Sequence, residues 1–261
     1  MKTVIFSNQK GGVGKTTLTR ELGIYISTLG RKVLLVDADP QGNLTKSLVE
    51  QPEDGLFDAL SGEGLRLTSI DGSLSILGGD FRLALLEKSL IGEIDAYTRL
   101  RVLLEDPGLS SFDLIFIDTP PSLGVLTVNA LAAASHLVVP MNPSLYSMQG
   151  TNDLMRTVSK VRTNLNPSLS LLGVIINAFD SVPVITRQIR AETQAAFGPK
   201  LFSTVLSKSI RLEEAIATRK GVIQQGHLSS MRRIAEEVKA LGDELLSRLA
   251  ASAVEGVLHV D

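Results

Sequence analysis

The chain alternates short, continuous apolar runs with stretches whose apolar residues recur at helical spacing, and this pattern constrains the fold most. A strand that is buried on both faces of a parallel sheet shows an apolar run without polar alternation. Such runs predict strands at residues 3–7, 32–37, 74–77, 114–118, 136–140 and 171–177. Since helical patterns lie between them, the sequence predicts βαβ units and an α/β fold, with a doubly wound, mostly parallel sheet flanked by helices.

The helical patterns cover residues 15–29, 82–105 with a break, 123–133, 147–165, 184–197 and 229–251. Gly30 and Gly198 follow two of them, where a glycine commonly ends a helix. The segment 50–72 is rich in Gly, Asp and Glu, which predicts a loop with a short helix. A length of 261 residues without repeats or a linker predicts a single domain over 1–261, with 229–251 as its C-terminal helix.

The composition excludes several classes of protein. There is no cysteine, so disulfides, thiolate metal sites, iron–sulfur clusters and cysteine nucleophiles are ruled out. No apolar stretch approaches the roughly 18 residues of a membrane span, and the first apolar run, 4–6, is too short for a signal peptide. We therefore expect a soluble, cytoplasmic protein.

A glycine-rich loop lies between the first predicted strand and the first predicted helix, which is where a phosphate-binding loop belongs. Its glycines allow backbone N–H groups to turn toward phosphates, and the helix N-terminus adds the positive end of its dipole. Lys15 should reach the β- and γ-phosphates, and the Thr16 hydroxyl should bind Mg²⁺. The residues expected to bind the nucleotide here are Lys10, Gly11, Gly12, Val13, Gly14, Lys15, Thr16 and Thr17.

Aspartates lie at the ends of two of the predicted strands. Asp37 ends the second run and Asp39 follows it, and Asp118 ends the fourth run as in a Walker B strand. Open α/β sheets bind ligands at the carboxyl ends of their strands, so these carboxylates can hold Mg²⁺ and orient an attacking water. A turn nucleated by Asp and Pro is the alternative for the first two. The expected metal-binding residues are Thr16, Asp37, Asp39 and Asp118, and the expected γ-phosphate switch is Asp118, Thr119, Pro120 and Pro121.

The loop departs from the common G-x-x-x-x-G-K-[ST] pattern, because Gln9 replaces the first glycine and Lys10 follows it. It resembles the deviant Walker A motif, x-K-G-G-x-x-K-[ST]. Together with the segments 37–43, 118–122, 128–131, 138–141, 146–150 and 209–215, this loop makes the chain resemble the ParA-type partitioning ATPases over about residues 1–225. The chain departs from that family at Ser207-Lys208, where a Pro-Arg pair is usual, and at 179–182.

The resemblance implies a P-loop ATP hydrolase, weak and stimulated by a partner, with ATP and Mg²⁺ as cofactors. It implies an ATP-dependent homodimer in which Lys10 reaches the ATP of the other subunit. Asp39 would orient the attacking water, with Asp37 nearer the metal, so the residues expected to act in catalysis are Lys10, Lys15 and Asp39. Asn177, which ends a predicted strand, matches the position that contacts adenine; an asparagine that serves only the turn after the strand is the alternative.

Charge is unevenly distributed along the chain. Residues 183–233 carry nine Lys and Arg against three acids, a balance of +6, whereas the whole chain carries −2. A basic segment with few aromatics fits the phosphate backbone of DNA, and the resembled family binds DNA without sequence preference. A solvated charged face is the alternative. The candidate DNA contacts are Arg187, Arg190, Lys208, Arg211, Arg219, Lys220, Arg232 and Arg233.

A MinD-like, membrane-associated positioning ATPase is the alternative function. Such proteins end in a basic amphipathic helix, whereas residues 234–261 hold six acids and two bases, which would repel anionic lipid. A nucleotide-binding module without hydrolysis would leave Asp39 and Asp118 unused. We expect no membrane partner, a location on the nucleoid, and a ParB-like or other adaptor protein as partner. No motif identifies the cargo, which could be a plasmid, a chromosome or a protein cluster.

Overall fold

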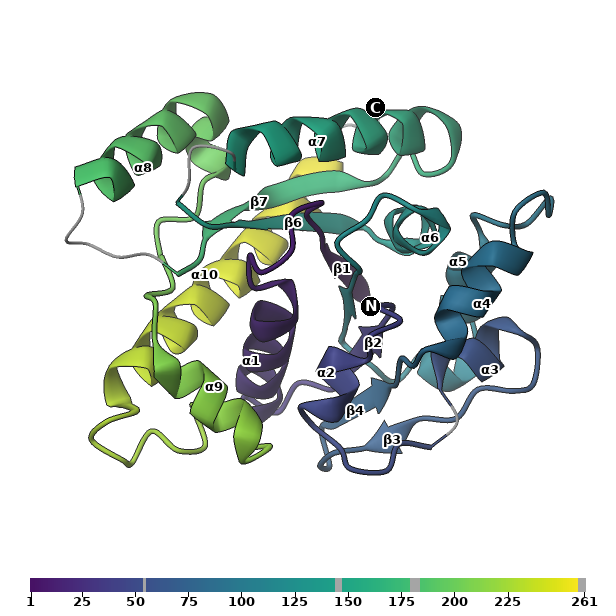
Figure 1. Cartoon of the computed structure of the whole chain (residues 1–261), viewed down its shortest axis with the longest axis horizontal. Helices are drawn as coiled ribbons and strands as arrows, with labels where there is room; N and C mark the ends of the chain where they lie inside the picture. The colour runs from purple at the N-terminus through teal and green to yellow at the C-terminus, as the bar shows by residue number, and fades with distance from the viewer. Residues whose placement is uncertain (54, 144–146, 179–183, 258–261) are drawn as a thin grey trace.

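The computed structural model describes residues 1–53, 55–143, 147–178 and 184–257, with the backbone alone at 147–150, 184–187 and 253–257. Its centre is a seven-stranded sheet in the order β3-β4-β2-β5-β1-β6-β7 (Figure 1). The strands are β1 (Lys2–Phe6), β2 (Val33–Asp37), β3 (Thr68–Ser69), β4 (Leu74–Leu77), β5 (Leu114–Asp118), β6 (His136–Met141) and β7 (Ser170–Ile176). All neighbouring pairs are parallel except β3 and β4. The predicted doubly wound sheet is confirmed; only β3 was not predicted.

Helices connect the strands. They are α1 (Lys15–Thr28), α2 (Asn43–Lys46), α3 (Leu56–Leu60), α4 (Arg82–Ser89), α5 (Arg99–Leu104), α6 (Val125–Ala133), α7 (Ser147–Asn164), α8 (Val184–Phe197), α9 (Ile210–Ala217) and α10 (Arg232–Val257), with 3₁₀ turns η1 (Pro107–Leu109) and η2 (Gly198–Lys200). The predicted break falls between α4 and α5, and α9 was not predicted as a helix. Gly30 and Gly198 have φ of 78° and 51°, as expected of glycines that end helices.

The two faces of the sheet are buried in two separate apolar clusters. Val4 and Phe6 of β1 belong to a cluster with α1 and α10, whereas Ile5 belongs to a cluster with α4, α5, α6 and α7. Figure 1 shows α1 and α10 on one side of the sheet and α6 on the other. Because successive side chains of a strand point to opposite faces, burial of both faces explains the continuous apolar runs.

Helix α10 covers α1. Its residues Ile234, Val238, Leu241, Leu245 and Leu249 are buried in the cluster that contains α1. The helices approach closely at Gly242, where an added Cβ would lie 2.3 Å from a ring carbon of Tyr25. Hydrophobic burial of this stripe therefore fixes α10 against the sheet through α1. None of the described helices is long and apolar enough to span a membrane.

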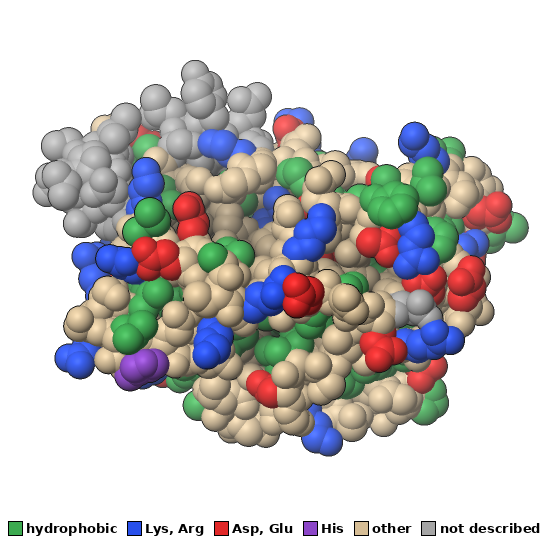
Figure 2. Space-filling view, turned by 60° about the horizontal axis from the view of Figure 1, so that its bottom comes forward, with side chains coloured by type: hydrophobic (Ala, Val, Ile, Leu, Met, Phe, Trp, Pro, Cys, Tyr) green, Lys and Arg blue, Asp and Glu red, His purple; other side chains and the backbone are tan. Residues whose placement is uncertain are grey.

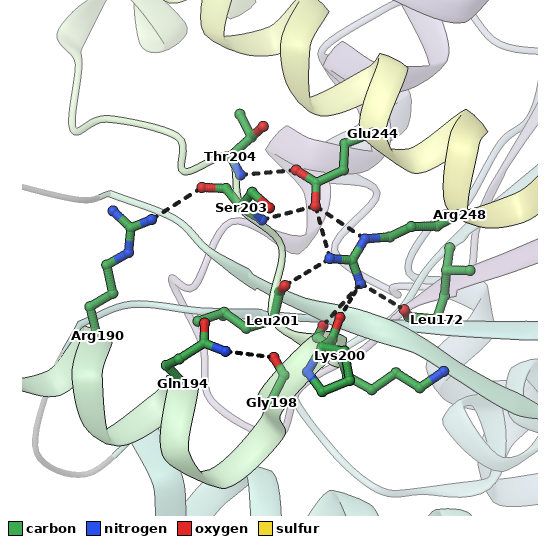
Figure 3. Close-up of polar contacts among 11 residues, drawn as sticks. Leu172, Arg190, Gln194, Gly198, Lys200, Leu201, Ser203, Thr204, Glu244 and Arg248 are labelled. Atoms are coloured by element: carbon green, nitrogen blue, oxygen red, sulfur yellow. Dashed lines mark hydrogen bonds and ion pairs between the residues drawn. The ribbon is translucent and has the colours of Figure 1, made fainter. Parts of the chain in front are cut away.

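A polar cluster joins α10 to the segment that follows α8 (Figure 3). Arg248 donates hydrogen bonds to the carbonyls of Pro199 (3.0 Å) and Leu201 (2.7 Å), and it forms an ion pair with Glu244. Glu244 in turn accepts from the backbone N–H groups of Ser203 and Thr204, both at 2.9 Å. These bonds hold the chain between α8 and α9 in place beside β7.

Parallel pairing brings the ends of the central strands to one edge of the sheet. In the register, Asp37 at the end of β2 pairs with Asp118 at the end of β5, and Phe6 at the end of β1 also pairs with Asp118. The glycine-rich loop follows β1 at the same edge. The site described next therefore lies at the carboxyl ends of parallel strands.

Candidate functional site

The glycine-rich loop leads from β1 directly into α1, which begins at Lys15. Gly12 and Gly14 have φ of 70° and 89°, in the left-handed region that glycine adopts without steric cost. Asn8 connects the loop to β6: its Oδ1 accepts from Lys10 N (3.1 Å), and its Nδ2 donates to Pro140 O (2.7 Å). Asn8 was not among the residues that the sequence predicts for the site.

Two further asparagines brace the loop from the ends of β6 and β7. Asn142 donates to the carbonyl of Gly12 and Asn177 to that of Val13, both at 2.9 Å. Engaging these carbonyls in hydrogen bonds reduces their repulsion of an anion and suits a loop that presents N–H groups to phosphates. Asn177 also packs against Gly14, because a Cβ at Gly14 would lie 2.0 Å from its Nδ2. The contact that Asn177 was expected to make with adenine stays a prediction.

A cavity of about 640 Å³ opens beside the loop. It is lined by Gly11, Gly12, Gly14, Lys15, Thr16, Thr17, Asp39, Gln41, Asn43, Lys46, Ser47, Pro121, Asn177 and Ile216. A second cavity of about 530 Å³ shares Gly12, Thr17, Asn177 and Ile216 with it and is bordered by Lys208. The fold thus brings together expected site residues from four separate segments, in a volume that suits a small ligand.

Thr16 and Asp118 form the centre of the expected metal site. The Thr16 hydroxyl donates to Asp118 Oδ2 at 2.6 Å. Asp118 is fully buried, and its other oxygen, Oδ1, has no hydrogen-bond partner in the described part of the chain. Burial, together with the neighbouring Asp37, raises the pKa of Asp118 well above its usual range. A cation bound here would stabilise the ionised carboxylate, so the residues fit Mg²⁺.

The protein supplies only part of a magnesium coordination shell. Among the described residues, no group of three or more His, Asp or Glu side chains could hold a metal ion. Mg²⁺ commonly binds through one or two protein oxygens, with waters and substrate phosphates completing its octahedral shell. Thr16, in the first turn of the helix that follows the phosphate loop, and Asp118, at the end of β5, match that pattern.

Asp37 and Asp39 have different surroundings. Both oxygens of Asp37 accept hydrogen bonds, from Asp39 N (3.2 Å), Thr45 N (2.9 Å) and Thr45 Oγ1 (2.7 Å), and burial raises its pKa to about 6. Asp37 therefore anchors the segment that carries Asp39. Asp39 lines the cavity, and its Oδ1 accepts from Gln41 N at 2.9 Å. Asp39 is thus placed to act on a ligand, whereas a metal contact of Asp37 stays a prediction.

A hydrogen bond from the side chain of Lys15 to the backbone of Lys10 connects the two lysines of the loop. Lys15 Nζ donates to Lys10 O at 3.4 Å, and only 7% of Lys15 is exposed. Burial lowers the pKa of Lys15, while the charges of Asp118 and Asp39 act in the opposite direction. In the expected switch, Thr119 Oγ1 donates to Phe6 O at 2.9 Å and Pro121 reaches the cavity. Thr119 thereby connects the segment after β5 to β1.

The expected DNA contacts fall into three groups. The first group is engaged in contacts within the chain: Arg211 pairs with Glu214 (2.6 Å), Arg219 with Glu50 (3.7 Å) and Arg233 with Glu237 (3.1 Å). In the same group, Arg190 donates a hydrogen bond to Ser203 O at 3.2 Å (Figure 3). Lys208, Lys220 and Arg232 are exposed, and no carboxylate in the described part of the chain lies within 4.0 Å of them. The Arg187 side chain lies outside the described residues, as do 179–182 of the family motifs. Figure 2 shows more Asp and Glu on the half of the molecule with α3 and α4 (right) than on the half with α9 (left).

The fold and the loop together define a class of protein. The first strand of the parallel sheet leads into a glycine-rich loop, Lys15 and Thr16 open the helix that follows, and a buried aspartate ends the adjacent strand. This is the architecture of a P-loop ATPase.

Comparisons with known proteins identify the family. A family model described as an AAA domain matches residues 1–171. The chromosome-partitioning ATPase Soj of Thermus thermophilus is 40% identical over 248 residues, which cover 92% of this chain and 96% of the relative. The sporulation initiation inhibitor protein Soj of Bacillus subtilis is 36% identical, over 85% of this chain and 90% of its own. The chain belongs to the ParA/Soj family of partitioning ATPases.

A solved structure of similar shape contains an ATP analogue and magnesium. Cobyrinic acid a,c-diamide synthase from Mycobacterium smegmatis, with a bound ATP analogue and magnesium, has a TM-score of 0.80 and 30% identity, and the match covers 94% of each chain. Its name describes a different reaction, so the similarity concerns the fold and its nucleotide. ATP and Mg²⁺ are the cofactors of the family to which the present chain belongs.

Proposed function

We propose that this partitioning ATPase works as an ATP-dependent homodimer, binds DNA without sequence preference, and is stimulated to hydrolyse ATP by an adaptor protein. The observation that carries the proposal is the convergence of Lys15, Thr16 and Asp39 on one cavity, with the buried Asp118 hydrogen-bonded to Thr16, beside a second cavity bordered by Lys208. The nucleotide site and a candidate contact with DNA are therefore neighbours. The location that follows is the cytoplasm, on the nucleoid.

Each residue of the site has a distinct task. Backbone N–H groups of the loop and Lys15 would bind the phosphates. Thr16 and Asp118 would hold Mg²⁺, which would supply positive charge to offset that of the phosphates. Asp39 orients the attacking water and accepts its hydrogen bond. Phosphoryl transfer depends mainly on such positioning and charge neutralisation, so this set of residues suffices for slow hydrolysis.

Dimer formation would occur at the face where the loop is open. Among the described residues, no atom lies within 4 Å of an ideal Cβ at Gly12, so the space into which a side chain would project there is open. A second subunit can approach the backbone there, and Lys10 of each subunit would contact the phosphates of the other. Dimerisation would also double the number of cations available to DNA.

Binding to DNA would depend on Lys208, Lys220 and Arg232, with the ion-paired arginines Arg211 and Arg219 nearby. Each phosphate that is neutralised releases counterions, so the affinity should fall steeply with salt. A contact with about six phosphates would weaken on the order of a thousandfold between about 50 and 200 mM salt.

The membrane-associated alternative is not favoured by α10. Its apolar residues through Leu249 are buried against α1, so this part of the helix has no apolar face to insert into lipid.

The test compares two triple variants that change the charge equally. In the first, Lys208, Lys220 and Arg232 become Glu; in the second, the exposed cations Lys88, Arg156 and Lys160 become Glu. Both should dimerise with ATP, as measured by sedimentation. Only the first should lose the ATP-dependent shift of plasmid DNA. Equal DNA binding by the two variants would place the contact elsewhere, and a wild type that never binds DNA with ATP would refute the proposal.

A further inference from the structure

Two consecutive residues of α1, Arg20 and Glu21, form an ion pair inside the protein. Their side chains are 0% and 1% exposed. Burial lowers the pKa of Arg20 and raises that of Glu21, and each partner's charge opposes the shift of the other. Removing two charges from water costs free energy that their mutual attraction need not recover, so stability alone does not account for this buried pair.

Arg20 connects two segments that line the nucleotide cavity. Its Nη2 donates to Ser47 O at 3.4 Å and to Ala215 O at 3.3 Å. Ser47 follows α2 and lines the cavity, while Ala215 precedes Ile216 of α9, which also lines it. One nitrogen atom is therefore bonded to both segments, so a shift of one segment that carries Arg20 with it changes the bond to the other.

Glu21 holds the segment that follows α9. Its Oε2 accepts from Val222 N at 2.9 Å. The backbone at Gly221 lies directly on α1, because a Cβ there would be 2.8 Å from Cγ2 of Ile24. Arg20 and Glu21 thus attach α1 to both the end of α9 and the turn beyond it.

That turn has a conformation that its own residues do not favour. Arg219 has φ of 55°, where a helix end normally carries glycine, and a left-handed residue with a side chain costs about 1–2 kcal/mol. Such a conformation persists when the surroundings fix it, and here it directs two exposed cations, Arg219 and Lys220, away from the core.

We propose that Arg20 and Glu21 are positioning residues that couple occupancy of the nucleotide cavity to the position of α9 and its basic turn, 219–220. The inference rests on the proposed function, since it explains how ATP would control a surface that binds DNA. A nucleotide that shifts the segment at Ser47 would move Ala215 through Arg20, and Glu21 would carry the turn with it.

The test needs a variant that removes the connection but not the fold. Arg20→Met with Glu21→Gln removes both charges together, which avoids leaving one buried charge unpaired. Gln keeps an oxygen for Val222 N, and Met fills the space of Arg20 without donating to either segment. The matched control is Arg248→Met with Glu244→Gln, which removes the ion pair of Figure 3 far from the cavity.

Hydrogen exchange of the amides of residues 215–222 measures the coupling without DNA. Addition of AMPPNP and Mg²⁺ should slow this exchange by about tenfold in the wild type and in the control, an effect in the usual range for coupled sites. In the Arg20→Met/Glu21→Gln variant the change should be less than about twofold, although the loop amides 11–17 still gain protection. Full retention of the effect at 215–222 in this variant, or its absence in the wild type, would overturn the inference.

DNA binding distinguishes failure of the inference from failure of the proposed function. At a concentration where both form ATP dimers, the Arg20→Met/Glu21→Gln variant should bind plasmid DNA about tenfold more weakly than the control. Equal binding by both would overturn the inference while leaving the proposed function intact. No binding by the wild type would refute the proposed function, while the exchange result would still decide whether the pair couples cavity and turn.

Discussion

The loop makes a specific prediction about Gly12. Replacing Gly12 with Val places a β-branched side chain at φ of 70°, where none of the described residues has an atom within 4 Å of the new Cβ. The steric cost of the left-handed conformation is about 1–2 kcal/mol, and a chain of this length loses about 2–4 °C of Tm per kcal/mol. We therefore expect Tm to fall by roughly 2–8 °C, with the monomer still folded.

Gly30 provides a matched control for this variant. It has φ of 78°, an added Cβ there also meets nothing within 4 Å, and it lies at the opposite end of α1. Gly30→Val should therefore lose the same stability. In sedimentation with ATP on an Asp39→Ala background, Gly12→Val should stay monomeric and Gly30→Val should dimerise. A Gly12→Val dimer of wild-type affinity would refute the argument that two loops meet at this glycine.

Four other variants test single contacts. Lys15→Ala should weaken ATP binding about a hundredfold or more, measured by nucleotide fluorescence, because a charged hydrogen bond contributes up to about 3 kcal/mol. Asp39→Ala should bind ATP normally and lower turnover by about a hundredfold or more in a phosphate-release assay. Arg219→Gly should raise the unfolding free energy in urea by up to about 1 kcal/mol, through relief of the left-handed φ, while weakening DNA binding. Burial, with the charges of Lys2 and Lys200, lowers the pKa of His136 to about 4. Between about pH 6.5 and 4 the unfolded chain binds a proton at this histidine and the folded chain does not, so the unfolding free energy should fall by about 3 kcal/mol as the pH is lowered over this range. His136→Gln should remove this contribution to the pH dependence, measured by urea titrations at both pH values.

The strands were predictable because their burial on both faces leaves a continuous apolar run. The exception, β3, consists of Thr68 and Ser69 and pairs only with β4 at the edge of the sheet, so it has no apolar run to detect. Helix α9 is short, but its start had a signal in the sequence. Ser209 caps it by accepting a hydrogen bond from Arg211 N, and Ser is a favoured residue at that position.

The candidate site was predictable where its residues are contiguous in a motif. Lys15, Thr16 and Thr17 lie in one loop, whereas the braces Asn8 and Asn142 depend on the position of β6, which no local pattern specifies. The basic segment illustrates both cases. The pair of Arg211 with Glu214 follows from helical spacing, but the pair of Arg219 with the distant Glu50 does not.

The separation of charge along the chain makes the molecule an electric dipole. Residues 183–233 carry +6 and the remainder carries −8, and on the face that Figure 2 shows, the half with α3 and α4 bears more Asp and Glu than the half with α9. A dipole turns in the field of a polyanion before contact, so encounters with one are oriented within the reach of about one Debye length, about 8 Å at physiological salt. Molecules bound to a polyanion in this orientation would expose their acidic halves to the solvent. Together they would form a negatively charged surface that attracts basic segments of other proteins.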